Sequence, residues 1–161
     1  MARVLIVGCG CRGRELARDL VVEMHAVRGT TRDPAAVEGI DAAGAEGVVA
    51  DPDRLGTLLP LLAGVTVVCW LMGSAEGEDA AALHGDRLES LLAKLVDSGV
   101  RGVVYEAAGS VDAALLYDGA EMVRAAGATN SMPVAVIDTA PDDHAAWLQA
   151  AKEAVGRVLA G

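Results

Sequence analysis

The stretch VLIVGCGCRG, residues 4–13, runs directly into RELARDL, residues 14–20. An apolar, strand-forming segment breaks into a turn with three glycines, and a segment with helical spacing of apolar residues follows. In a dinucleotide-binding turn, Gly8 would bend the chain at the strand end, Gly10 would let the backbone approach a pyrophosphate, and Gly13 would let helix and strand pack closely. The sequence therefore predicts a phosphate-binding turn close to the start of the chain.

The helix after this turn strengthens the prediction. Its first N–H groups and the positive end of its dipole would face the phosphates, and Cys11 and Arg12 would line the site together with the glycines. The alternative is a tight turn that binds nothing, because a chain with 19 glycines can produce this spacing by chance. We favour phosphate binding because the strand before the turn and the helix after it both match the motif.

Six short β-branched runs alternate with segments of helical period, which is typical of a parallel sheet covered by helices on both faces. With right-handed crossovers, this order predicts a doubly wound, Rossmann-like α/β sheet of order 3-2-1-4-5-6 in three layers. The length predicts a single domain over residues 1–161, without a separate substrate-binding lobe. The predicted strands are residues 3–8, 25–30, 46–50, 65–71, 101–106 and 133–138.

The segments between the strands predict helices. Leu55, Leu58, Leu59 and Leu62 share one helical face, and Asp51-Pro52 is typical of a helix start. Alanines favour a helix over residues 35–45 and glycines oppose it, so this region is ambiguous. The longest predicted helices cover residues 85–98, 111–126 and 142–159.

Composition excludes several classes of function. The net charge of −10 disfavours binding to nucleic acid or to an anionic membrane surface, and 2% aromatic residues leave little for stacking on bases. Arginine is nevertheless concentrated near the glycine turn, which suggests a local phosphate site. These arginines are Arg3, Arg12, Arg14, Arg18, Arg28 and Arg32.

The cysteines and the apolar runs give the expected location. No apolar run reaches the roughly 20 residues of a membrane-spanning helix, and the odd number of cysteines does not suggest a secreted disulfide framework. We expect a cytoplasmic protein. Cys9 and Cys11 in the turn and Cys69 in a strand are expected to be small packing residues; a metal or redox role for the Cys-x-Cys pair is the weaker alternative, and no metal site is predicted.

The second predicted strand ends in threonine and arginine, where NAD-binding folds usually carry an acidic residue that binds the adenosine ribose. Arg32, beside Thr31, offers a guanidinium group suited to a 2′-phosphate, which a carboxylate would repel. We therefore expect NADP(H) to be favoured over NAD(H). Arg28 is expected to be a solvated surface charge.

The chain resembles the short-chain dehydrogenase/reductase superfamily, in its extended and atypical branches. The resemblance implies that Gly8, Gly10 and Gly13 line the pyrophosphate, Thr31 and Arg32 the 2′-phosphate, and Asp51 the adenine edge, with Leu71, Met72 and Gly73 against the adenosine or nicotinamide half. The chain has GxGxxG where extended members commonly have GxxGxxG, and the resemblance is to a truncated form. The matching stretches are VLIVGCGCRGRELARDL, HAVRGTTRDP, GAEGVVADPDRLGTLLPLLAGVTVVCWLMGSA and GVRGVVYEAAGSV, spread over residues 3–137.

Reductases of this superfamily use a Tyr-x-x-x-Lys pair, in which the lysine lowers the tyrosine pKa. The best-aligned tyrosine here, Tyr117, has Glu121 at the lysine position, and Tyr105 has Gly109 there. Ser110 could take the serine position, although capping the following helix is its expected role. Two interpretations remain open: a non-catalytic NADP(H) binder, sensor or subunit, or a small NADPH-dependent oxidoreductase that acts without the usual relay.

Two histidines and an acidic loop complete the candidates. His84 and His144 precede predicted helices and are expected to be solvated or capping residues, with acid/base or metal roles, such as His144 beside Asp142 and Asp143, as the alternative. The loop with Glu76, Glu78 and Asp79 is expected to be solvated, or to form a mobile lid.

Helices 83–98 and 111–126 are those through which many members of the superfamily form homodimers. The second carries Leu115, Leu116, Met122 and Val123, so a homodimer is possible. The other expected partner is the dinucleotide.

Overall fold

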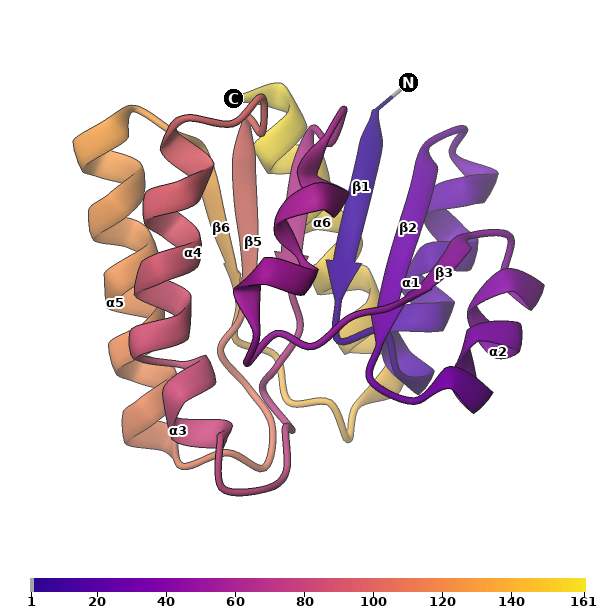
Figure 1. The fold of residues 1–161 in the computed structure, drawn as a ribbon, viewed down its shortest axis with the longest axis horizontal. Coiled ribbons are helices and arrows are strands. Elements are labelled where there is room, and N and C mark those ends of the chain that lie inside the picture. Colours follow the sequence, from indigo (N-terminus) through magenta and orange to yellow (C-terminus); the bar gives the residue numbers. More distant parts are fainter. Residues whose placement is uncertain (1) are drawn as a thin grey trace.

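A computed structural model describes residues 2–161, which form a parallel sheet with helices on both faces (Figure 1). The strand order is β3-β2-β1-β4-β5-β6, so the predicted Rossmann-like α/β fold is confirmed. Every predicted strand is present, with ends that differ from the prediction by at most two residues. The strands are β1 (Arg3–Val7), β2 (Ala26–Thr31), β3 (Glu46–Val49), β4 (Val67–Trp70), β5 (Gly102–Glu106) and β6 (Val134–Ile137).

Alternating side chains on the central strands divide the core into two parts. In β1, Val4 and Ile6 belong to the core on one face, whereas Leu5 and Val7 belong to the core on the other. All four are completely buried, as expected for a parallel strand covered on both sides.

Three helices cover each face. The first face is covered by α1 (Cys11–Val22), α2 (Val37–Ala42) and α6 (His144–Ala160), and the second by α3 (Ala80–Leu83), α4 (Asp86–Val96) and α5 (Ala113–Asn130). The carboxyl ends of the strands lie together at the lower edge in Figure 1. Within residues 2–161, none of the helices is both long and apolar enough to cross a lipid bilayer.

The helix prediction for residues 51–62 was wrong. The segment forms two short 3-10 helices, Leu55–Thr57 and Leu59–Leu62, and Pro60 lies in the second. Proline has no N–H to donate to a longer α-helical ladder. The ambiguous residues 35–45 likewise form a 3-10 turn, Pro34–Ala36, before the short α2.

Aspartates define the starts of the last two long helices. Asp112 accepts a hydrogen bond from the Ala114 N–H at 2.8 Å, so Asp112 caps α5 and the expected capping role of Ser110 was wrong. Asp143 accepts from the Ala146 N–H at 3.2 Å and places the start of α6 at His144. Side-chain caps of this kind satisfy N–H groups that have no partner within the helix.

Candidate nucleotide-binding site

A cavity of about 450 Å³ lies at the carboxyl ends of β1 and β4. This volume falls within the range of small-molecule sites. Strand β1 pairs with β2 on one side and β4 on the other, so the chain connections reverse direction here. Doubly wound sheets bind ligands at such a switch point.

The three glycines of the turn have different surroundings. Gly8 has a φ of +82°, and a Cβ there would collide with the Met72 side chain and the Leu71 carbonyl. Gly13 is buried, and a Cβ would lie 3.4 Å from the Cys9 sulfur. Around Gly10 a Cβ would meet nothing within 4 Å, so the backbone at Gly10 borders open space in the cavity.

The start of α1 faces this open space. Gly10 is the N-cap and supplies no side-chain hydrogen bond, and the first turn of α1 contains no acidic residue. The first N–H groups of the helix thus remain without intrahelical acceptors, which makes the end of α1 a favourable position for an anion.

At the β2 side of the cavity, Thr30 supports the turn: its hydroxyl accepts a hydrogen bond from the Gly8 N–H at 3.3 Å. Thr31 and Arg32 line the cavity wall. Arg32 lies between two carboxylates, with Nε 3.2 Å from Asp51 and Nη2 2.6 Å from Asp79. The predicted neighbours Arg32 and Asp51 are therefore brought together, in an ion pair.

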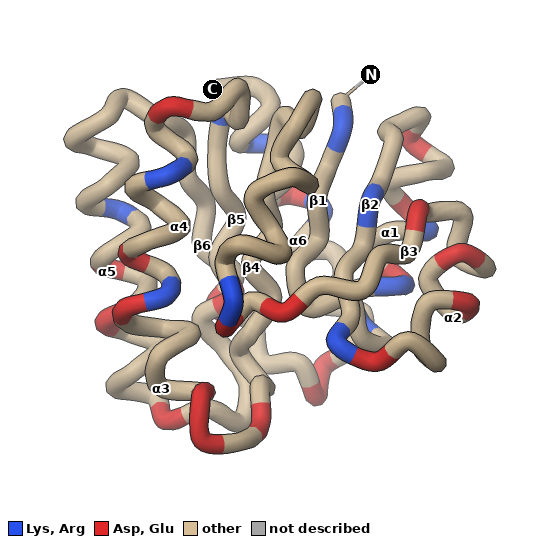
Figure 2. Tube along the Cα trace, viewed as in Figure 1, with Lys and Arg blue, Asp and Glu red and all other residues tan. Residues whose placement is uncertain are grey.

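Asp79 belongs to the acidic loop between β4 and α3, where acidic positions gather in Figure 2. Its ion pair ties that loop to the segment after β2, so Asp79 is not simply a solvated charge. Glu76 from the same loop is exposed and lines the cavity.

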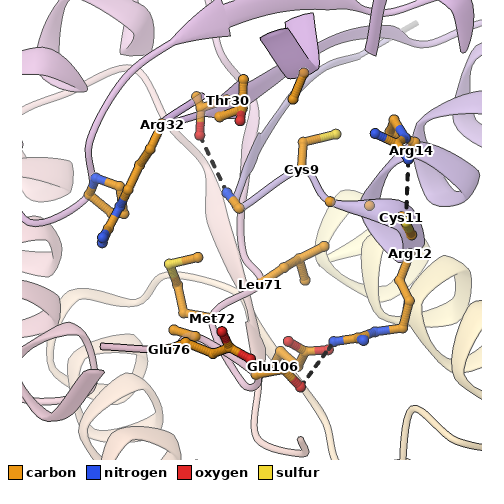
Figure 3. A pocket seen from close by; sticks show the side chains of 18 of the residues that line it. Cys9, Cys11, Arg12, Arg14, Thr30, Arg32, Leu71, Met72, Glu76 and Glu106 are labelled. Atoms are coloured by element: carbon orange, nitrogen blue, oxygen red, sulfur yellow. Dashed lines mark hydrogen bonds and ion pairs between the residues drawn. The ribbon is translucent and has the colours of Figure 1, made fainter. Parts of the chain in front are cut away.

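At the opposite side, the carboxyl end of β5 places Glu106 in the cavity wall with no exposed surface. Its Oε1 accepts from the Gly73 N–H at 2.8 Å, and its Oε2 from the Trp147 indole N–H at 2.9 Å. Arg12 pairs with the same Oε2 at 3.2 Å, and its guanidinium lies 5.3 Å from the centre of the Trp147 ring. We call Arg12, Glu106 and Trp147 the Glu106 cluster. Figure 3 shows Arg12 and Glu106 on the side of the cavity away from Arg32.

Sequence reasoning missed Glu106 and Trp147. The available signal was a carboxylate that ends an otherwise apolar strand, VVYE, at the edge of the sheet where ligands bind. Trp147 gave a weaker sequence signal, because its position beside Glu106 depends on packing between segments that are 41 residues apart.

The other predicted cofactor residues fall into two groups. Leu71 and Met72 line the cavity beside the glycine turn (Figure 3). Gly73 is buried behind the wall, where a Cβ would collide with the Ala108 carbonyl. Asp51 lies between the wall residues Ala50 and Pro52.

Neither of the two weak catalytic candidates lines this cavity, although the Ser110 N–H donates to the hydroxyl of the wall residue Ser74 at 3.3 Å. Tyr117 is 66% exposed on α5. Ser110 is exposed in the loop after β5 and lines a second cavity, of about 490 Å³, at the ends of β5 and β6. The structure therefore places neither Ser110 nor Tyr117 in the wall of the cavity beside the glycine turn.

The two cysteines of the turn differ in solvent exposure. Cys9 is buried in the core, where desolvation raises the pKa of its thiol to about 12, and burial has the same effect on Cys69. Cys11 is exposed at the start of α1, and its sulfur accepts a hydrogen bond from Arg14 at 3.3 Å. Thiols that stay protonated at neutral pH are poor metal ligands.

The expectation that His84 is solvated was wrong. Its Nε2 lies 2.7 Å from the Met72 carbonyl oxygen and therefore donates to it, which leaves Nδ1 to accept from the Tyr105 hydroxyl. Burial lowers the His84 pKa below its ordinary value of 6.5, so the imidazole is neutral. His144 is exposed as expected, but it pairs with Glu15 of α1 at 2.5 Å rather than with Asp142 or Asp143.

The chain matches no protein-family model and no curated protein sequence. Solved structures do match. A short-chain dehydrogenase/reductase superfamily protein from Agrobacterium tumefaciens with bound NAD is 21% identical, with a TM-score of 0.70, over 84% of this chain and 48% of that one. Vestitone reductase from alfalfa is 16% identical, with a TM-score of 0.64, over 86% of this chain and 56% of that one.

A third match is triphenylmethane reductase from Citrobacter sp., complexed with NADP(H). It is 17% identical, with a TM-score of 0.64, over 85% of this chain and 49% of that one. The chain thus spans about half the length of these three proteins. The predicted resemblance is confirmed as a shared fold: the chain has the Rossmann-like fold of short-chain dehydrogenase/reductase proteins.

Proposed function

We propose that this protein binds a nicotinamide dinucleotide at the turn after β1, as a non-catalytic binder, sensor or subunit. The observation that carries the proposal is the open space beside Gly10, at the uncapped start of α1. Backbone that borders a cavity at a helix N-terminus suits a pyrophosphate. Two of the structural neighbours contain NAD or NADP(H), which supports the same ligand class for this fold.

Within this proposal, Gly8, Gly10, Cys11, Arg12 and Gly13 hold the pyrophosphate. Gly8 and Gly13 shape the turn, and the backbone from Cys11 to Gly13 supplies N–H groups, whereas the Gly10 N–H already donates to the Gly8 carbonyl. Leu71 and Met72 form an apolar wall beside the turn, and Gly73 packs against the loop after β5.

We propose NADP(H) as the favoured form, with one condition that follows from the ion pairs of Arg32. Thr31 and Arg32 would meet the 2′-phosphate, but Asp51 and Asp79 already neutralise the guanidinium. A phosphate dianion beside two carboxylates would be repelled. NADP(H) binding therefore requires Asp79 to leave Arg32, and Asp51 to turn toward the adenine edge.

The non-catalytic interpretation is supported by the positions of the two catalytic candidates, neither of which lines the cavity. Tyr117 is exposed on α5 and Ser110 lines a different cavity. The alternative, a small NADPH-dependent oxidoreductase, would require hydride transfer without a tyrosine relay. Oxidation of bound NADPH by a quinone or flavin acceptor, followed at 340 nm, would favour that alternative.

A homodimer through α4 and α5 remains a proposal. Leu116 and Val123 pack in the core of the chain itself, which leaves half-buried Leu115 and Met122 and exposed Tyr117 for a partner. Light scattering coupled to size exclusion tests this assembly.

Calorimetric titration with NADPH, NADP⁺, NADH and NAD⁺ tests the dinucleotide site, with nicotinamide fluorescence followed in parallel. We expect saturable binding of at least NADPH, without its consumption. If folded protein, verified by circular dichroism, binds none of the four, the turn is structural and the proposal fails.

A further inference from the structure

The two sides of the cavity differ in how much room they leave for a ligand. Toward β2 the wall contains the small side chains of Thr31, Ala36, Ala50 and Pro52, together with Arg32, which is held by Asp51 and Asp79. Toward β5 the Glu106 cluster forms the wall with a bulky indole and an ion pair. A ligand whose phosphates lie at the glycine turn therefore has the Glu106 cluster next to it on the side toward β5.

Separating the residues of the Glu106 cluster would cost considerable free energy. Glu106 is completely buried, and both of its carboxylate oxygens are engaged by the Gly73 N–H, the Trp147 indole and Arg12. Within residues 2–161, Arg12 supplies the only ion pair that Glu106 makes. Moving Arg12 away would leave a buried charge without a counterion, which is strongly destabilising.

Arg12 nevertheless has an exposed part that can serve a ligand. Its side chain is 28% exposed and lines the cavity. Glu106 and the Trp147 ring hold the guanidinium in place, so little conformational freedom is left to lose on binding. Its Nη2 already donates to Ser74 and Glu106 and its Nε is buried, so the remaining amino group, Nη1, is the one that can donate to a phosphate.

Phosphate-binding groups are thus present at two points along the cavity. The start of α1 beside Gly10 suits one phosphate, and the Arg12 guanidinium, held at the β5 side, suits a second. The side toward β2, beside Arg32, can accept a nucleoside. The arrangement fits a nucleoside diphosphate that ends at the Glu106 cluster.

We infer that the cavity recognises the adenosine diphosphate moiety, with Arg12 on the second phosphate, and that the nicotinamide half of a dinucleotide adds no net affinity. This inference rests on the proposed function, because it specifies which part of the proposed ligand the site binds. ADP and ADP-ribose then bind as tightly as the dinucleotides that contain them.

Calorimetry on the unmodified protein tests this directly, with ligands matched at the 2′ position. ADP and ADP-ribose are compared with NADH and NAD⁺, and 2′-phospho-ADP-ribose is compared with NADPH. We expect dissociation constants within about threefold in each set, and no measurable binding of nicotinamide mononucleotide. Dinucleotide binding at least about tenfold tighter than that of the matched ADP-ribose, or binding of nicotinamide mononucleotide, overturns the inference.

These outcomes separate the inference from the proposed function. Tight dinucleotide binding with weak ADP-ribose binding leaves the function in place and removes the inference. Absence of binding for all adenine nucleotides removes both.

A substitution tests the role of Arg12. Arg12→Lys keeps a cation beside Glu106 but loses the planar fork, so ADP affinity should fall about tenfold while AMP affinity stays unchanged. Arg18→Lys, on an exposed part of the same helix, is the control and should change neither. Equal losses for ADP and AMP in Arg12→Lys, at an unchanged Tm, would place Arg12 away from the second phosphate and overturn its assignment.

Discussion

Tyr105 of β5 donates its hydroxyl proton to Nδ1 of His84 across 2.5 Å, and both side chains are buried beneath the cavity wall. Through Nε2, the same imidazole holds the Met72 carbonyl. One buried histidine thus joins a central strand to the chain segment that forms the site.

The neutral state of His84 predicts how stability depends on pH. Burial lowers the pKa of His84 in the folded state, whereas the unfolded chain takes up the proton near pH 6.5. The stabilisation is therefore complete above pH 6.5 and is lost as the pH falls below it, by up to about 1.4 kcal/mol per pH unit. Urea denaturation at pH 7.5 and 5.5 measures this loss, and His84→Gln should reduce the difference. An unchanged difference in His84→Gln would assign the pH dependence to other groups.

Gly119 predicts a strong effect of one added methyl group. A Cβ at Gly119 of α5 would collide with the Tyr105 hydroxyl, which is fixed by His84. Gly119→Ala should therefore destabilise the fold by about 1–3 kcal/mol. Gly156→Ala in α6, where a Cβ meets nothing within 4 Å, should instead stabilise it by about 0.5–1 kcal/mol. Thermal denaturation of both variants measures these effects. Equal shifts of Tm would contradict the close approach of Gly119 to the Tyr105 hydroxyl.

Gly10 predicts loss of binding without loss of fold. Its φ of −83° suits any residue, and a Cβ enters open cavity space. Gly10→Leu should keep the circular dichroism spectrum and the Tm within a few degrees while abolishing nucleotide binding. Gly99→Leu, in an exposed turn with equally open surroundings, should bind normally. If the Gly10→Leu variant still binds the nucleotide, the phosphates do not lie beside Gly10.

Asp79 predicts a change in cofactor preference. Asp79→Asn removes one of the two carboxylates on Arg32 and should raise affinity for NADPH relative to NADH about two- to fivefold, as expected for an exposed ion pair. Arg32→Asp should reverse the preference. Glu78→Gln removes a neighbouring charge of the same loop and serves as the control. If titrations give the same NADPH to NADH ratio for Asp79→Asn and the unmodified protein, Arg32 does not read the 2′-phosphate.

Much of the fold could be predicted from the sequence because its signals are local. The β-branched runs that became β1 to β6 are bounded by glycine, proline and aspartate, and the order of strands follows from right-handed crossovers. The helix prediction for the segment Leu55–Leu62 was wrong because the spacing of its apolar residues imitates that of a helix, whereas Pro60 prevents a continuous α-helix.

The site was predictable only in part, for a related reason. The glycine turn and Arg32 are recognisable within short windows of sequence. The Glu106 cluster joins residues from α1, β5 and α6, and one of the two partners of Arg32, Asp79, lies 47 residues away. Such pairings depend on tertiary packing, which periodicity and short motifs do not encode.

The Arg32–Asp79 ion pair also has a kinetic consequence. It bridges the segment after β2 and the loop before α3, so it must open whenever a 2′-phosphorylated nucleotide settles beside Arg32. Salt weakens exposed ion pairs, and it also screens the repulsion between an anionic ligand and a chain of net charge −10. The association rate of NADPH should therefore rise with ionic strength. Salt would thus accelerate entry of the ligand, although it weakens the ionic contacts of the bound ligand.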